Sequence, residues 1–114
     1  MPLNRSGTLS LLRVHEVGSG CGPPTDFIDV EVVTQFVGDA ADAYGFQLRA
    51  DSNQPVRQGM LDLLRDAFNN NWIANIDYNT PPGKHNGIIV RVWVTKPSRT
   101  QPAAVSRKRR ATPS

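Results

Sequence analysis

The most constraining feature of this sequence is a single amphipathic helix that follows three strand-like runs and precedes two more. Pro55 suits a first helical position, and the asparagines at 69–71 tolerate the left-handed backbone of a helix end. Apolar residues between these limits recur at helical spacing and predict one core-facing stripe, formed by Val56, Met60, Leu63, Leu64, Ala67 and Phe68. The order strand-strand-strand-helix-strand-strand predicts a mainly β domain with one helix.

Five runs have the composition or alternation of strands, and they cover residues 7–17, 27–36, 43–50, 72–78 and 88–95. Together with the helix, they follow the chain order of a small five-stranded OB-type barrel, which is the fold that we predict. An open sheet crossed by one helix and a ferredoxin-like fold are the alternatives. The ferredoxin-like fold needs two crossover helices, and the sequence indicates only one.

Alternation along the runs also predicts which side chains point inward. In the run 27–36 the apolar face is predicted to be buried, whereas Asp29 and Glu31 lie on the outer face. In the run 88–95 the inward set is Ile88, Val90, Val92 and Val94, and the outward set is Ile89, Arg91 and Trp93. Exposed apolar residues on this last strand suggest self-association, through Ile89, Arg91 and Trp93.

The chain is predicted to hold a loose leader at residues 1–6, a single OB-like domain at 7–96 and a disordered basic tail at 97–114. Residues 1–96 have a net charge of −2 and residues 97–114 a net charge of +5, which together give the +3 of the whole chain. Cations in the tail could neutralise phosphates of a nucleic acid, and a solubility tail or a localisation signal explains them equally well: Arg107, Lys108, Arg109 and Arg110.

Cysteine content and hydropathy limit the possible environment. One cysteine, Cys21, excludes an internal disulfide, and no apolar run approaches the length of a membrane span. The first residues are too polar for a signal peptide, so we expect a soluble, cytoplasmic protein without a membrane partner. The sequence contains no catalytic or metal-binding motif, and we expect no enzymatic activity, no cofactor and no metal.

Two Gly/Pro-rich loops are the predicted binding elements, because the corresponding loops of OB-folds usually bind the ligand. They cover residues 18–26 and 79–87, and each contains a Pro-Pro pair that limits the entropy lost on binding. The candidate binding residues are Cys21, Lys84, His85, Asn86, Arg91 and Trp93. The alternative is that both loops are solvated connections whose glycines and prolines only shape turns.

The helix segment MLDLLRDAF, the strand IANIDY and the closing strand GIIVRVWV follow one another in residues 43–95. This layout resembles the small OB-fold B subunits of bacterial AB5-type toxins. The resemblance implies a non-catalytic, ring-forming module that recognises glycans or a partner protein. We therefore expect a homo-oligomeric binding module of OB type, and a nucleic-acid-associated OB protein that uses the basic tail is the alternative.

Overall fold

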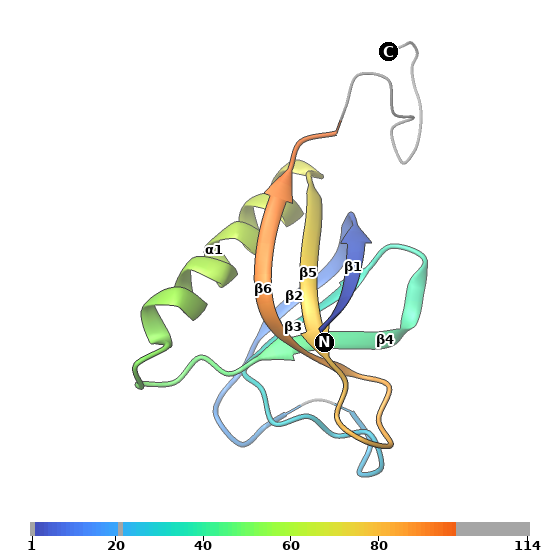
Figure 1. Cartoon of the computed structure of the whole chain (residues 1–114), viewed down its shortest axis with the longest axis vertical. Helices are drawn as coiled ribbons and strands as arrows, with labels where there is room; N and C mark the ends of the chain where they lie inside the picture. The colour runs from blue at the N-terminus through green and yellow to red at the C-terminus, as the bar shows by residue number, and fades with distance from the viewer. Residues whose placement is uncertain (1, 21, 98–114) are drawn as a thin grey trace.

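The computed structural model describes residues 2–20 and 22–97 and confirms a mainly β architecture with one helix (Figure 1). Its elements, in chain order, are β1 (Leu3–Gly7), β2 (Leu9–Val14), β3 (Val32–Phe36), β4 (Asp39–Phe46), α1 (Gln54–Asn70), β5 (Ile73–Asn79) and β6 (Gly87–Thr95). In the described part of the chain no helix is both long and apolar enough to cross a membrane.

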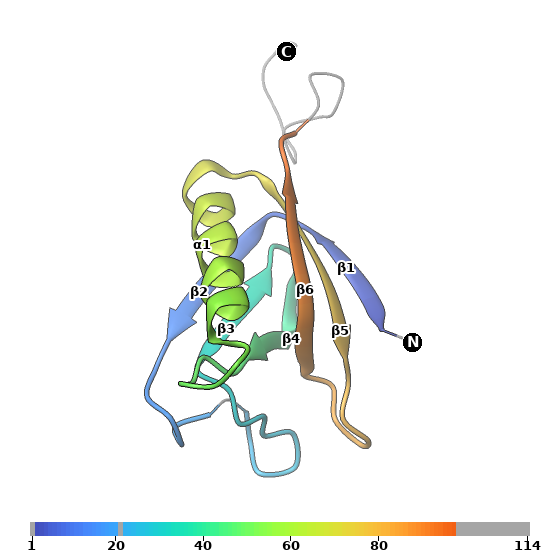
Figure 2. The ribbon, with the colours of Figure 1, turned by 60° about the vertical axis from the view of Figure 1, so that its left-hand side comes forward.

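The strands form one mixed sheet of six strands in the order β1-β5-β6-β4-β3-β2. All neighbours are antiparallel except β4 and β6, which are parallel and pair only at Tyr44 with Gly87 and Gly45 with Ile88. The sheet is open, because no pairing joins β1 to β2, and a five-stranded closed barrel is not confirmed. These two end strands are nevertheless consecutive in the chain, with only Thr8 between them, and they follow one bent path (Figure 2).

The N-terminal residues differ most from expectation. Part of the expected loose leader is a paired strand, since β1 runs antiparallel to β5 from Leu3 opposite Tyr78 to Gly7 opposite Ala74. Most side chains of β1 are polar, so the strand has no hydrophobic pattern in the sequence. One of them forms a hydrogen bond with the neighbouring strand: the Ser6 hydroxyl donates to Asn75 Oδ1 at 2.7 Å. A half-exposed end strand needs no apolar alternation, and for this reason the hydropathy pattern does not reveal it.

The main core lies between the sheet and α1, which covers one side of it (Figure 2). Met60, Leu64 and Ala67 are the helix residues buried there. The predicted stripe was too wide, because Val56, Leu63 and Phe68 are exposed. The helix ends as expected, with Asn71 in the left-handed region at a φ of 56°.

A β-bulge in β6 reverses the predicted inward and outward sets at the start of this strand. Asp77 pairs with Arg91 and Tyr78 with Ile89, so Val90 has no partner on β5. Because one extra residue shifts the phase of the alternation, Ile89 enters the main core while Val90 is 48% exposed. Val92 and Val94, beyond the bulge, contact the core as predicted.

The predicted strand 27–36 is regular only from Val32 onward. Ile28 and Val30 pack with Val33 and Ala43 in a second, smaller hydrophobic cluster, which is separate from the main core. Gly45 makes room for this cluster, because a Cβ there would lie 2.4 Å from the Val32 carbonyl oxygen and 2.7 Å from Val30 Cγ2. The irregular segment 27–31 thereby packs closely against β4.

Two glycine-to-alanine substitutions should change stability in opposite directions. Gly45→Ala forces a methyl group against backbone and should lower the free energy of unfolding by about 1–3 kcal/mol. Gly59→Ala lies in α1 with no atom within 4 Å of the added Cβ, so it should raise the same quantity by roughly 1 kcal/mol. Urea unfolding of both variants measures these differences. Equal stability of the two variants would contradict the close approach at Gly45.

Candidate functional site

The two loops that the sequence singles out meet at Asp26. Its carboxylate Oδ1 accepts hydrogen bonds from the backbone N–H groups of His85, at 2.7 Å, and Asn86, at 3.2 Å. In return, the Asn86 side-chain amide donates to the Asp26 carbonyl oxygen at 3.0 Å. Three hydrogen bonds therefore hold the loops 18–26 and 79–87 together as one surface.

Asn86 connects this surface to the sheet. Its side-chain oxygen accepts a hydrogen bond from the backbone N–H of Ala43 in β4, at 2.9 Å. Asn86 is only 4% exposed, and both polar atoms of its side chain form hydrogen bonds within the protein. Asn86, predicted as a binding residue, is consequently a structural link between the loops and β4.

The other predicted residues of loop 79–87 have different environments. The Lys84 ammonium donates to the carbonyl oxygen of Phe27 and so reaches across to the opposite loop. The His85 side chain is 83% exposed, with Nδ1 4.0 Å from Asp26 Oδ2. The hydrogen bond from the His85 backbone lowers the pKa of Asp26, and the nearby charges of His85 and Lys84 act in the same direction. Asp26 is thus held as a carboxylate, which keeps the loops joined.

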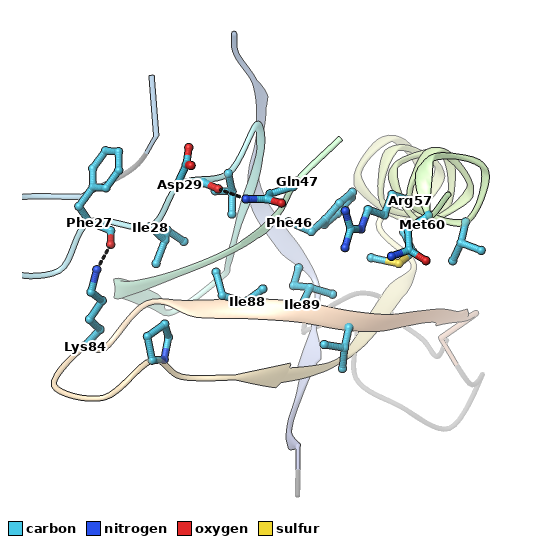
Figure 3. Close-up of a pocket in the computed structure, with 15 residues that line it drawn as sticks. Phe27, Ile28, Asp29, Phe46, Gln47, Arg57, Met60, Lys84, Ile88 and Ile89 are labelled. Atoms are coloured by element: carbon cyan, nitrogen blue, oxygen red, sulfur yellow. Dashed lines mark hydrogen bonds between the residues drawn. The ribbon is translucent and has the colours of Figure 1, made fainter. Parts of the chain in front are cut away.

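Next to the joined loops lies a pocket of about 530 Å³ (Figure 3). It opens where β4 and β6 separate beyond their short parallel pairing, and the N-terminal end of α1 forms its far wall. Phe46, Met60 and Ile89, all buried in the main core, lie behind its floor. The exposed apolar side chains of the lining are Val56 and Val90. Ile28 enters from the segment before β3, and Lys84 stands at the loop end.

The polar side chains of the pocket lining differ in how many ion pairs and hydrogen bonds they already form. Asp29 is paired, because Arg49 Nη2 lies 2.8 Å from its Oδ1. Arg57, on α1, contacts Asp51 at 3.5 Å in an exposed ion pair of the kind that contributes little. The side chain of Asn53, the residue before α1, makes no capping hydrogen bond. The pocket therefore offers Arg57 and Asn53 as available donors.

The predicted acidic outer face of the segment before β3 is neutralised by Arg49. Glu31 is 3% exposed and accepts from Arg49 at both oxygens, Nε to Oε1 at 3.0 Å and Nη2 to Oε2 at 2.8 Å. The backbone N–H of Leu48 donates to the same Oε1 at 2.9 Å. The hydrogen bonds from Arg49 lower the pKa of Glu31 below its usual range, and burial opposes them. This pair fixes the end of β4 beside the pocket.

The remaining predicted residues are not brought to the loops. Arg91 pairs with Asp77 across the sheet, Nη1 to Oδ2 at 3.4 Å, and Trp93 is partly exposed further along β6. Ile89, expected on an outer contact surface, is buried and cannot contribute to one. Cys21 and the tail cations Arg107, Lys108, Arg109 and Arg110 lie outside the described residues.

Asp26, Arg57 and the pocket itself were not found by sequence reasoning. Asp26 had a usable signal, since an aspartate at the end of a Gly/Pro-rich loop commonly accepts backbone N–H groups. Arg57 had none, because one cation in the first turn of an amphipathic helix is ordinary solvent-facing surface. The pocket depends on how far β4 and β6 separate, and no residue pattern encodes that distance.

Within residues 2–20 and 22–97 no group of three or more His, Cys, Asp or Glu side chains could hold a metal ion. No protein-family model, curated protein or solved structure was found to match the chain. The resemblance to AB5-type toxin B subunits stays a prediction.

Loss of the Glu31–Arg49 pair should change the pH dependence of stability. Because the folded pKa of Glu31 is lowered from 4.5, its contribution is fully present above that pH and is lost as the pH falls through the folded pKa. Glu31→Gln should lower the free energy of unfolding at neutral pH by about 2–3 kcal/mol, since it removes the buried partner of Arg49 and leaves only Asp29, whose side chain is 52% exposed. The difference from the unmodified protein should shrink below pH 4.5.

Urea unfolding over a pH series measures this effect. Asp66→Asn is the matched control, because Asp66 is exposed and its carboxylate forms none of the ion pairs found among the described residues. A Glu31→Gln deficit that is the same at acidic and neutral pH would show that the charge of Glu31 does not stabilise the fold.

Proposed function

We propose that this protein is a non-enzymatic binding module of OB type that recognises a protein partner through the joined loops 18–26 and 79–87. The observation that carries the proposal is the set of hydrogen bonds between Asp26, His85 and Asn86. These bonds hold two loops distant in sequence in one arrangement before any partner arrives. A surface ordered in advance loses less conformational entropy on binding.

The OB-type assignment is supported by the connection between the two ends of the sheet. β1 and β2 would be the two halves of one bent first strand, with the break at Thr8. The Thr8 carbonyl oxygen accepts a hydrogen bond from Val37 N–H at 2.9 Å, which holds the bend against the turn between β3 and β4. β1 and β2 are the two edge strands of the sheet. If they are counted as one continuous strand, the same strand forms both edges, and the sheet then closes on itself as a barrel requires.

The chemistry of the loops favours a protein partner over the alternatives. Pro23, Pro24 and Pro82 are exposed on this surface, and they offer stiff apolar contacts rather than the donor pairs that hold sugars. Binding of a nucleic acid on the sheet would need unpaired cations, and Arg49 is instead paired with Glu31 and Asp29. The tail cations, on which the nucleic-acid alternative depends, lie outside the described residues. A second copy of the chain is one possible protein partner, as the toxin-subunit resemblance implies.

Site-specific photocrosslinking tests the proposal. A photoreactive phenylalanine analogue at exposed position 85 should give a crosslinked protein adduct in extracts of the native cells, because the side chain there projects from the joined loops. The same analogue at position 69, exposed near the end of α1, is the control and should give none.

Mass spectrometry of the adduct identifies the partner. A second copy of this chain would support the self-associating form of the proposal, and light scattering of the purified protein should then give a mass above that of the monomer. Equal adducts at both positions, or none at position 85, would contradict recognition through the loops.

A further inference from the structure

The pocket beside the loops is apolar at its floor and lies between elements that cannot close on it. β4 and β6 are joined at Tyr44–Gly87 and Gly45–Ile88 and then separate, so no strand pairing fills the space beyond. Phe46 and Met60 are held in the main core behind the floor and cannot turn away without unpacking it. The floor is therefore fixed, and Val56 and Val90 are the exposed apolar side chains of the lining. The pocket volume of about 530 Å³ falls in the range of small-molecule sites.

The charges around this floor favour an anion. Two cations, Arg57 and Lys84, belong to the lining, while its single carboxylate, Asp29, is paired with Arg49. Arg57 extends from α1 toward the middle of the pocket, opposite the end where Lys84 stands (Figure 3). Its exposed contact with Asp51, at 3.5 Å, is long enough for an incoming carboxylate to replace it with shorter, charge-assisted hydrogen bonds.

We propose that this pocket binds a small amphipathic carboxylate, a molecule with an apolar body and one anionic group. The apolar body lies against the exposed side chains of Val56 and Val90, and the carboxylate accepts hydrogen bonds from Arg57 and from the side-chain amide of Asn53. The carboxylate-binding residues of this inference, Asn53 and Arg57, lie outside the two loops, and Lys84 is shared with the proposed partner surface.

Titration of the ¹⁵N-labelled full chain with decanoate, kept below its micelle concentration, tests the proposal. Decanoate should shift the amide signals of residues in the lining, and Arg57 and Ile89 should be among those most affected. The neutral comparison is 1-decanol, which has the same chain length without the charge. It should bind about tenfold more weakly, since it forgoes the charge-assisted hydrogen bonds.

Two pairs of variants on α1 separate specific binding from general attraction. Arg57→Gln should weaken decanoate binding about tenfold, whereas Arg65→Gln removes an equal charge outside the pocket and should leave binding unchanged.

Val56→Trp places a bulky ring at the pocket wall and should block binding. Leu63→Trp makes the same change at an exposed position outside the lining and should not.

Each result decides the matter. Equal affinity for decanoate and 1-decanol, or equal effects of Arg57→Gln and Arg65→Gln, would overturn the anionic part of the proposal. Shifts confined to residues away from the lining, or no saturable shift, would overturn the site itself. Since Val56 and Arg57 are partly or fully exposed, these variants are expected to fold, and their spectra without ligand verify it.

Discussion

The rest of the structure depends on the short parallel contact between β4 and β6. It consists of two residue pairs, and glycine stands on each strand at the contact: Gly45 on β4 and Gly87 on β6. A Cβ at Gly87 would lie 2.4 Å from Tyr78 Cδ2, and one at Gly45 would lie 2.4 Å from the Val32 carbonyl oxygen. Only glycine lets the strands and their covering groups approach this closely. Without this contact, the three antiparallel strands β2, β3 and β4 would have no pairing to the three antiparallel strands β1, β5 and β6.

Both candidate binding features follow from this contact. On one side of it, the chain enters β6 directly from loop 79–87, so Asn86 reaches the Ala43 backbone and the neighbouring residues reach Asp26. On the other side, β4 and β6 separate and leave the pocket between them and α1. The joined loops and the pocket are therefore adjacent for a geometric reason. Lys84 lines the pocket and also donates to the Phe27 carbonyl oxygen beside the opposite loop, so the two proposed sites share one residue.

The sequence predicted a mainly β chain with one helix, two strands after that helix and the helix ends, because each of these follows from local periodicity or turn chemistry. It predicted three strands before the helix, whereas the structure has four. The prediction failed where a single extra residue shifts the alternation of inward and outward side chains, and where a strand consists mainly of polar residues. The bulge at Val90 exchanges the inward and outward sets without changing composition. Residues 28–31 alternate between apolar and acidic side chains but pack irregularly, and β1 is a strand made largely of polar residues. The candidate site was predicted in part: its loops were found, whereas Asp26, Arg57 and the pocket depend on tertiary geometry that alternation does not encode.

Amide hydrogen exchange of a Gly87→Ala variant tests the central claim most directly, because the added methyl group would press on Tyr44 of β4 and Tyr78 of β5 at the β4–β6 contact. The account predicts that the amides of Ala43, His85 and Asn86 lose protection together, since all three depend on that contact for their acceptors. Amides in the β2–β3 pairing, such as Val33, should keep their protection. Retained protection at Ala43 and His85, or a uniform loss throughout the sheet, would contradict the claim that this contact organises the loops and the pocket.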